Sequence, residues 1–281
     1  MRVRWPMLAS VTTMTTTQRT TPLIMIDGVN AASAESASVH LDDGLVRGDG
    51  VFEGLRTYAR VLRTPQAHLD RLARSASQVD IQLDLPVIRE ELDHFCEMTS
   101  EPDCAVRLMV TRGGQRIFRE EPIPADNGGF RLLPVHHRVT PLLIGSKTLS
   151  YAANMQAARL ARAAGCHDGL FIRAEDDAVL EGPTWSLGWI DGDTLVLPPL
   201  DAGVLDSLTR RIAVATLKTR EDVAPVASLA TADGVLILST VMEARPVAEI
   251  HGVGRFDPQG SSVTRMIADM HDATLAAVGR G

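Results

Sequence analysis

Leu-Ile-Gly-Ser-Lys-Thr-Leu-Ser-Tyr, at residues 143–151, contains one of only two lysines among the 281 residues; the other is Lys218. Arginine carries the rest of the positive charge. A primary amine can lose its proton, attack a carbonyl and form a Schiff base, which a guanidinium cannot do. Lys147 follows an apolar run and precedes a helical stretch, which predicts a buried site between strand and helix. It is therefore a catalytic candidate, with an ordinary structural lysine as the alternative, whereas Lys218 lies at the polar end of an amphipathic segment and is expected at the surface.

The composition is that of an ordinary globular protein, with 45% hydrophobic and 22% charged residues. The net charge of −7 argues against nucleic-acid binding, which requires a basic face. No apolar run approaches the roughly 20 residues of a membrane span. Cys96, Cys104 and Cys166 lack the spacing of a metal site, so we expect reduced thiols and a cytoplasmic protein.

Strands and helices mix along the chain without a regular βαβ alternation, which favours an α+β fold with two domains. We expect a Thr-rich disordered tail at residues 1–21 and an N-terminal α/β domain at 22–125. Proline, asparagine and glycine concentrate near residues 120–129, so a linker region is predicted at 126–141. The C-terminal domain is expected at 142–281.

Hydrophobic periodicity and turn residues predict the individual elements. Expected strands are 22–27, 54–62, 105–111, 130–136, 169–173, 185–190, 194–197 and 235–239, with a short apolar segment at 142–145. Expected helices are 65–79, 87–98, 152–164, a helix from Asp206 or Ser207 to about 218, and a last one within 259–278.

Several residues could belong to a site, and each has a simpler structural interpretation. Gly48-Asp49-Gly50 does not match the G-x-G-x-x-G fingerprint and fits a glycine-rich turn equally well. Glu181, between apolar residues and a Gly-Pro turn, needs a cationic or hydrogen-bonding partner if it is buried. Thr209 at a helix start and the Ser239-Thr240 pair at a strand end could bind an anion. Together with Lys147 and an arginine, these features are what a pyridoxal phosphate site needs.

Four blocks of sequence resemble the class IV aminotransferases, the fold-type IV pyridoxal phosphate family of branched-chain aminotransferases, D-amino acid aminotransferases and aminodeoxychorismate lyases. The resemblance covers roughly residues 22–275. The blocks are Arg47-Gly-Asp-Gly-Val-Phe-Glu-Gly54 with His68-Leu-Asp-Arg-Leu72; Lys147-Thr-Leu-Ser-Tyr-Ala-Ala-Asn154; Leu180-Glu-Gly-Pro183 with Pro198-Pro-Leu200 and Leu208-Thr-Arg210; and Ser239-Thr-Val-Met-Glu243 with Pro246-Val247.

The resemblance implies a smaller N-terminal α/β domain and a larger C-terminal domain with a pseudo-barrel sheet. It also implies roles for single residues. Lys147 matches the Schiff-base lysine and proton shuttle, and Glu181 matches the partner of the pyridine nitrogen. The implied phosphate ligands are Arg71, Leu208, Thr209, Ser239 and Thr240; Tyr151 matches the tyrosine near the phenolic oxygen; and the substrate candidates are Phe52, Arg47, Arg107, Arg116 and Val241.

Two departures from the family pattern concern the substrate pocket. Arg47 stands where many branched-chain enzymes have a tyrosine, and the segment 112–147 is shorter than is usual in the family. The resemblance implies an aminotransferase that acts on amino acids and 2-keto acids. The alternatives are an aminodeoxychorismate lyase, which releases 4-aminobenzoate and pyruvate, and a non-catalytic binding protein with the same fold. A homodimer that binds neither nucleic acid nor membrane is expected.

Overall fold

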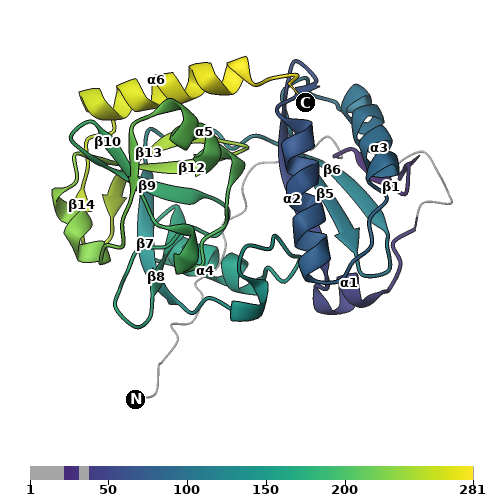
Figure 1. Cartoon of the computed structure of the whole chain (residues 1–281), viewed down its shortest axis with the longest axis horizontal. Coiled ribbons are helices and arrows are strands. Elements are labelled where there is room, and N and C mark those ends of the chain that lie inside the picture. The colour runs from purple at the N-terminus through teal and green to yellow at the C-terminus, as the bar shows by residue number, and fades with distance from the viewer. Residues whose placement is uncertain (1–21, 32–37, 281) are drawn as a thin grey trace, which may run out of the picture.

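The computed structural model describes residues 22–31 and 38–280, so the tail expected at 1–21 lies outside the described residues. The chain forms two halves, each built on its own sheet (Figure 1). In the N-terminal half, six antiparallel strands follow the order β2-β1-β6-β5-β3-β4. Their bounds are β1 (Ile24–Ile26), β2 (Val29–Asn30), β3 (Gly50–Tyr58), β4 (Val61–Leu62), β5 (Ala105–Thr111) and β6 (Arg116–Glu121).

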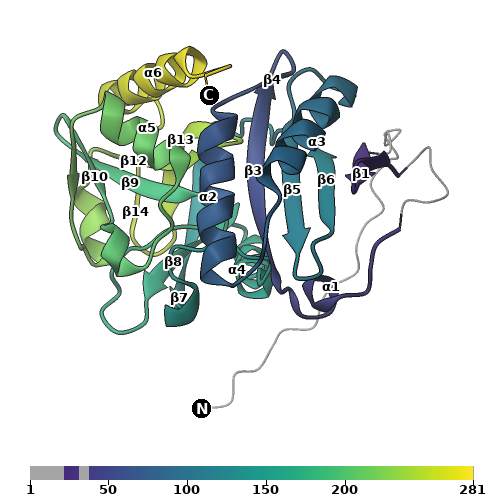
Figure 2. The same cartoon turned by 45° about the vertical axis from the view of Figure 1, so that its right-hand side comes forward.

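Two amphipathic helices cover one face of this sheet, as Figure 2 shows for α2 (Pro65–Gln78) and α3 (Leu85–Met98). Proline within the first two positions of each helix fits its start, because its missing N–H would have no intrahelical partner there. The Asp84 carboxylate caps α3 by accepting from the backbone N–H of Val87. The buried faces pack on β3, β5 and β6 through Leu69, Leu72, Ile88, Leu92 and Phe95. A short helix, α1 (Asp43–Arg47), precedes β3.

The C-terminal half is an eight-stranded curled sheet in the order β11-β10-β9-β12-β13-β7-β8, with β14 paired to β13. The pairs β10–β11, β7–β13 and β7–β8 are parallel, and the others are antiparallel. The bounds are β7 (Phe130–His137), β8 (Asp168–Arg173), β9 (Ser186–Asp191), β10 (Thr194–Leu197), β11 (Thr219–Glu221), β12 (Gly234–Ser239), β13 (Glu243–Ile250) and β14 (Gly254–Arg255).

Helices enclose this second sheet. Apolar side chains of α5 (Leu208–Thr216) and α6 (Ser261–Ala276) pack on β9, β10 and β12, while α4 (Ala152–Ala163) packs on β8. Ser207 is the N-cap of α5, since its hydroxyl accepts from the Arg210 backbone N–H. Three short 3-10 helices complete the fold: η1 (Pro141–Leu143), η2 (Leu200–Ala202) and η3 (Val226–Thr231).

The two halves meet along β3, which pairs with the segment that carries Lys147. Thr148 forms a bridge with Val51, and the Leu149 backbone N–H donates to the Gly50 carbonyl at 2.8 Å. A Cβ on Gly50 would lie 2.5 Å from the Leu149 side chain and 2.6 Å from the Val110 carbonyl oxygen. Glycine is therefore favoured at this position because the Leu149 side chain and the backbone of β5 lie close to it.

The α+β fold is confirmed, and the structure differs from the expected elements in a few places. β3 begins at Gly50 and turns at Ala59 and Arg60, which both adopt positive φ, so one expected strand is a hairpin. β6 was not expected, because its sequence is largely charged. β7 confirms the strand expected at 130–136, and its pairing with β8 and β13 places it in the C-terminal sheet although it lies inside the region expected as a linker. The proposed domain limits stay a prediction.

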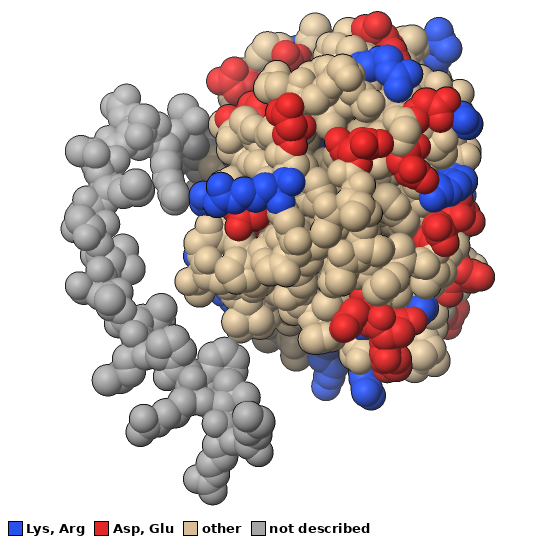
Figure 3. Space-filling model, turned by 90° about the vertical axis from the view of Figure 1, so that its left-hand side faces the viewer, with Lys and Arg blue, Asp and Glu red and all other residues tan. Residues whose placement is uncertain are grey.

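No helix within residues 22–31 and 38–280 is both long and apolar enough to cross a membrane. Figure 3 shows acidic and basic side chains interspersed on the C-terminal half, and the face in view has no continuous basic stripe. The expected absence of nucleic-acid binding and the cytoplasmic location stay predictions.

Candidate active site

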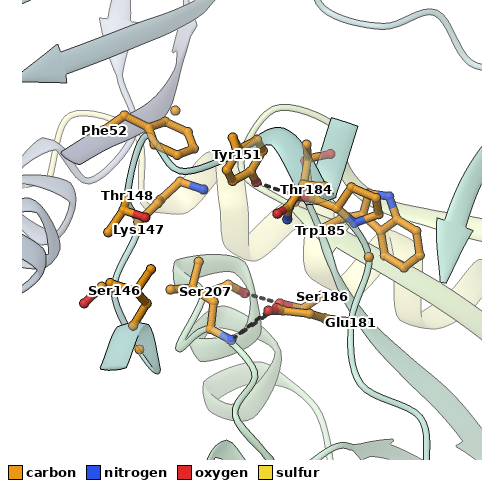
Figure 4. Close-up of a pocket in the computed structure, with 18 of the residues that line it drawn as sticks. Phe52, Ser146, Lys147, Thr148, Tyr151, Glu181, Thr184, Trp185, Ser186 and Ser207 are labelled. Carbon is orange, nitrogen blue, oxygen red and sulfur yellow. Dashed lines mark hydrogen bonds between the residues drawn. The ribbon is translucent and has the colours of Figure 1, made fainter. Parts of the chain in front are cut away.

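A cavity of about 270 Å³ lies between the two halves, and both halves contribute to its lining. β3 supplies Phe52 and Gly54, and β5 supplies Arg107. The C-terminal half adds three segments: residues 143–151 before α4, 181–186 before β9, and 238–241 at the end of β12. Figure 4 shows Phe52, Lys147, Tyr151 and Glu181 around this space.

Lys147 is fixed by its backbone while its amine projects into the cavity. Its carbonyl accepts from the Phe52 N–H at 3.0 Å, and its N–H donates to Ser75 Oγ at 3.0 Å. Nζ lies 4.2 Å from the Phe52 ring centroid and 5.8 Å from that of Tyr151. The side chain is half-buried because the cavity opens beside it. Among the described residues, no acceptor forms a hydrogen bond with Nζ.

Burial, followed by the charge of Arg71, lowers the pKa of Lys147 to about 8. An amine with this pKa is partly unprotonated near neutral pH and can act as a nucleophile or a base. The apolar run before it is not buried as expected, since Leu142 in η1 is 83% exposed. Lys147 thus follows η1 and not a strand, and the expected burial holds only in part, since the amine faces the cavity while the run before it is exposed.

Glu181 faces the same cavity from the C-terminal half. Its carboxylate accepts from the Leu205 backbone N–H at 3.1 and 3.2 Å, as Figure 4 shows. Burial raises the pKa of Glu181 to about 7, although this bond and the charge of Lys147 oppose the rise. The carboxylate has one protein donor and several unused acceptor positions, so a cationic donor placed in the cavity would stabilise its ionised form.

Arg71 reaches the cavity from α2 and is held by two buried neighbours. Its Nε and Nη2 both donate to Glu53 at 2.7 Å, and His68 Nδ1 lies 2.8 Å from the same carboxylate. Nη1 lies 3.5 Å from the Asp206 carbonyl oxygen, just before α5. Arg71 is thus oriented toward the N-terminus of α5, where backbone N–H groups favour an anion.

Leu208 and Thr209 are the first two residues of α5, and both side chains are buried. The Thr209 hydroxyl accepts from Arg63 Nη2 at 3.4 Å, so it points away from the cavity lining. What these residues offer to an anion is their backbone N–H groups. Ser207, which was not predicted as a site residue, lines the cavity and accepts from Ser186 Oγ at 2.9 Å.

Ser239, Thr240 and Val241 line the cavity together at the end of β12. The Ser239 hydroxyl accepts from the Met242 backbone N–H at 3.1 Å, so it stabilises the turn between β12 and β13. Thr240 is half-buried, and no protein hydrogen bond of its hydroxyl occurs within the described ranges. Of the two hydroxyls, that of Thr240 is therefore the one available to an anion.

Tyr151 stands beside Lys147 at the start of α4. Its ring meets Phe52 edge-on at 5.1 Å between centroids, and its hydroxyl donates to the Pro183 carbonyl oxygen. Asn154 Nδ2 donates to the same oxygen at 2.9 Å. The phenol therefore lies within the cavity, next to the amine, with its pKa raised by burial.

The substrate candidates divide into two groups by position. Phe52, Arg107 and Val241 line the cavity, where the Arg107 guanidinium lies 5.1 Å from the Phe52 ring centroid. Arg47 is exposed and pairs with Asp43, whereas Arg116 at the start of β6 pairs with Glu91 of α3 at 2.7 Å. The structure does not bring Arg47 and Arg116 to the cavity, and a substrate role for them has no support from their contacts.

Sequence reasoning missed some cavity residues. His137 at the end of β7 stacks on Phe171 at 4.3 Å between centroids, and Trp185 Nε1 donates to Asp168 at 2.8 Å. Neither residue belongs to a short motif. Their apolar strand context predicts core positions, and only the curled sheet places them on the cavity. Asn154, by contrast, ends a quoted block and could have been found.

This set of groups fits pyridoxal phosphate. An amine without a hydrogen-bonding partner, a buried carboxylate with one donor, and an arginine beside a helix N-terminus share one cavity. Gly54 adds room, since no atom lies within 4 Å of the position that its Cβ would take. The cofactor requires these groups for its aldehyde, ring nitrogen and phosphate, respectively.

Comparison with known proteins gives a consistent result. The family model described as "Amino-transferase class IV" matches residues 50–250. A putative branched-chain-amino-acid aminotransferase from Methanocaldococcus jannaschii is 29% identical over 255 residues, which cover 81% of this chain and 88% of that protein. A bifunctional aminodeoxychorismate lyase / D-amino acid transaminase from Mycobacterium tuberculosis is 29% identical over 276 residues, which cover 85% of this chain and 94% of that protein.

Among solved structures, a hypothetical aminotransferase from Mycobacterium tuberculosis in its PLP-bound form superimposes with a TM-score of 0.79. It is 25% identical in sequence, and the match covers 90% of this chain and 99% of that one. The shared architecture spans both halves and therefore includes the cavity between them.

Proposed function

The chain belongs to the amino-transferase class IV family, a family of pyridoxal phosphate-dependent enzymes, and we propose that it moves an amino group between an amino acid and a 2-keto acid. One observation carries this proposal: the amine of Lys147 and the carboxylate of Glu181 face the same cavity, with Arg71 nearby. Family membership together with these three side chains favours an enzyme over a non-catalytic binding protein.

Pyridoxal phosphate would be held by groups from both halves. Lys147 would hold its aldehyde carbon, Glu181 its ring nitrogen, and Tyr151 would lie near its phenolic oxygen. Arg71, the N–H groups of Leu208 and Thr209, and the Thr240 hydroxyl would hold the phosphate, with Ser239 shaping the turn. When bound, the cofactor supplies an electrophilic carbon and a ring that accepts electrons from the substrate α-carbon.

The protein groups have separate tasks in this scheme. Lys147 is the proton carrier: its lowered pKa allows the free amine to take the α-proton of the substrate and return it later. Glu181 would pair with the protonated ring nitrogen of the bound cofactor. Burial makes the ionised carboxylate unfavourable when it is alone, and a neighbouring cation would stabilise it. The apolar rings of Phe52 and Tyr151 exclude water from the amine.

For the substrate we propose contacts with Phe52, Arg107 and Val241. Arg107 is held by Glu121, which accepts from its Nε at 2.8 Å and from its Nη2 at 3.0 Å. Among the residues that the structure describes, none accepts a hydrogen bond from Nη1, which can contact a substrate carboxylate. This placement is supported by the position of Arg107 in the cavity, next to the ring that also contacts Lys147.

The test is a visible absorption titration of the purified protein with pyridoxal phosphate, followed by separate additions of D-alanine and L-leucine. We expect the bound cofactor to absorb in the visible and to change to its amine form with an amino donor; 2-oxoglutarate should reverse this change. Lys147→Ala should lose turnover. Substantial transamination by that variant would contradict the assignment.

Aminodeoxychorismate lyase is the second candidate, because the Mycobacterium tuberculosis relative carries that activity in its name together with D-amino acid transaminase. After proton removal, a lyase eliminates pyruvate and releases 4-aminobenzoate. Incubation with aminodeoxychorismate distinguishes the two activities. Pyruvate release without a change in the final cofactor spectrum would identify a lyase.

A homodimer is also proposed for this chain. Apolar side chains are exposed around α1 and on η1 beside the cavity, notably Leu41 (82%), Leu45 (57%) and Leu142 (83%). A second copy would remove these side chains from water, which is favourable. Light scattering on the purified protein should give twice the mass of one chain, and a monomer at all concentrations would contradict this proposal.

A further inference from the structure

The hairpin between β12 and β13 forms one wall of the cavity, and its turn ends in an unusual residue. Ser239 pairs with Glu243 across the hairpin, so residues 240–242 form a three-residue loop. Such loops commonly end in a left-handed residue, a position that glycine occupies most easily. Here the left-handed residue is Glu243, which directly follows the loop as the first residue of β13 and has a φ of 60°. A strained non-glycine residue indicates that its side chain makes contacts that glycine lacks.

The Glu243 carboxylate is the centre of a polar group that joins the two halves. Its Oε1 accepts from the Tyr58 hydroxyl at 2.8 Å and lies 3.0 Å from Arg56 Nη1. Its Oε2 lies 2.6 Å from His271 Nδ1 on α6. We call Arg56, Tyr58, Glu243 and His271 the interdomain cluster. Tyr58 and Glu243 are 185 residues apart in the chain.

The cluster also holds the turn directly. Arg56 Nη1, which contacts the Glu243 carboxylate, donates to the Val241 carbonyl oxygen at 2.7 Å. Thr240 and Val241, which line the cavity, are thus enclosed between the Ser239–Met242 hydrogen bond and the Arg56 contact. Glu243 itself does not line the cavity, so any influence it has on a ligand must act through this turn.

β3 connects this cluster to the Lys147 side of the cavity. Successive side chains of a strand alternate between its faces, so Phe52, Gly54, Arg56 and Tyr58 share one face. The first two line the cavity and the last two contact Glu243. The position of the β12–β13 turn is therefore fixed relative to Phe52, and through its ring relative to Lys147.

Burial alone would raise the pKa of Glu243, but the bonds from His271 and Tyr58 and the charge of Arg56 keep it below its usual value. The carboxylate is therefore ionised, and its contacts are charge-assisted, which makes them stronger and shorter than neutral hydrogen bonds. The group is 9% exposed, so water competes weakly for it.

We propose that Glu243 is a positioning residue that, with Arg56 and Tyr58, fixes the turn at residues 239–242 and so determines how tightly the cavity binds the phosphate of its cofactor. This inference rests on the proposed function, because it assumes that Thr240 contacts that phosphate. Within the described ranges, the other hydrogen bonds of the turn are those of the β12–β13 hairpin itself.

The test compares Glu243→Gly, Glu243→Gln and Tyr58→Phe by titrating each apoprotein with pyridoxal phosphate, with inorganic phosphate as competitor. Glu243→Gly relieves the backbone strain while it removes the contacts of the carboxylate, and its thermal midpoint is measured beside the titration. This variant should weaken cofactor binding about 10-fold, because charge-assisted bonds to the carboxylate are lost. Glu243→Gln and Tyr58→Phe should each weaken it by about 3-fold, and the double variant should be less than additive because the two residues contact each other.

Asp177→Gly is the matched control. Asp177 also has a positive φ, of 59°, and its carboxylate contacts His136 at 2.8 Å, but it does not line the cavity or contact the turn. Cofactor affinity should be unchanged in this variant. If Glu243→Gly and Glu243→Gln both bind pyridoxal phosphate as tightly as the wild-type protein, the inference about Glu243 is wrong while the proposed function stands. Absence of cofactor binding by the wild-type protein would overturn the proposed function as well.

Discussion

Glu53 determines how Arg71 meets the cavity, although it does not line the cavity itself. It is fully buried and accepts from Arg71 Nε and Nη2, both at 2.7 Å. Burial alone would raise the pKa of Glu53, but the charge of Arg71 and the bonds from Arg71 and His68 lower it to about 2. A carboxylate with this many partners orients the guanidinium and leaves Nη1 for other contacts.

Glu53→Gln should destabilise the protein by about 3–5 kcal/mol, because it leaves the buried Arg71 charge uncompensated. The pKa of Glu53 is lower in the folded protein than its ordinary value of 4.5, so its stabilising effect is complete above that value. It is lost as the pH falls toward 2. Urea denaturation of wild type and variant between pH 7 and pH 3 measures both effects, and the variant should lose less stability over this range.

Glu97→Gln serves as the control for this change, since Glu97 is 79% exposed on α3 and its pairing with His94 at 3.8 Å is weak. Its effect should stay within about 0.5 kcal/mol. Equal stability of Glu53→Gln and wild type would show that the buried ion pair does not hold Arg71.

The lowered pKa of Lys147 gives a second prediction at this scale. Only the unprotonated amine reacts with an aldehyde, so the rate at which the apoprotein reacts with pyridoxal phosphate should rise with pH up to about 8 and level off above it. Stopped-flow absorbance from pH 6 to pH 10 gives this profile. A rate that continues to rise to pH 10 would contradict the burial of the amine.

Short motifs indicated the central residues in advance. Lys147, Glu181 and Arg71 could be selected from sequence because amine, carboxylate and guanidinium chemistry is specific and each lies in a recognisable block. Arg116 shows the limit of this reasoning. The sequence around Arg116 does not indicate which residue its guanidinium contacts. Only the fold places Glu91 of α3 beside Arg116.

At the scale of elements, the pairing of β3 with the Lys147 segment favours glycine at residue 50. In Gly50→Ala the new Cβ would meet the Leu149 side chain and the backbone Val110 carbonyl oxygen of β5, so β3 must shift at this point and with it the Lys147 segment that pairs there. Displacement of the amine should weaken cofactor binding at least about 10-fold, as contacts that require exact placement are lost. Titration of the apoprotein with pyridoxal phosphate measures this.

Gly54→Ala is the control for Gly50→Ala. It places the same substitution on β3 at a position where the new Cβ is not crowded. Its Cβ would have no atom within 4 Å, so the thermal midpoint should stay close to that of wild type. A similar loss of thermal stability in both alanine variants would show that crowding at residue 50 is not the cause.

The helices could be predicted closely and some strands could not. α2, α3 and α4 follow apolar residues at helical spacing, and proline or glycine lies at or next to an end of each. β6 has the sequence Arg-Ile-Phe-Arg-Glu-Glu. Its four charged residues do not indicate a strand, although β6 pairs with β1 on one side and β5 on the other. β13 contains Pro246 and polar residues. Its hairpin partner β12 is adjacent, but its other partner β7 is distant in sequence and pairs with an irregular register between Val247 and Glu249.

At the scale of the whole molecule, the end of the chain joins the two halves. α6 runs along the C-terminal half and its end reaches the N-terminal half (Figure 1). Val278 forms a bridge with Arg63, and the Gly279 backbone N–H donates to the Leu62 carbonyl at 3.0 Å. The fold class followed from the order of the sequence blocks, but these contacts between distant residues could not be predicted from local patterns.

A chain that ends at Ala277 should be less stable because these backbone contacts are lost. The expected loss is about 1–2 kcal/mol, and the melting temperature should fall by roughly 2–4 °C for a protein of this size. Differential scanning calorimetry measures both. An unchanged melting temperature would show that the contacts at Leu62 and Arg63 do not stabilise the arrangement of the halves.

The most direct measurement uses the rarity of lysine in this chain. The protein is incubated with pyridoxal phosphate, reduced with borohydride, digested and analysed by mass spectrometry. With only Lys147 and Lys218 present, the reduced adduct should be found on the peptide that contains Lys147 and not on that with Lys218. Lys218, exposed and paired with Asp193, is the internal control. An adduct on Lys218 alone, or none on Lys147, would contradict the assignment of this cavity as the pyridoxal phosphate site.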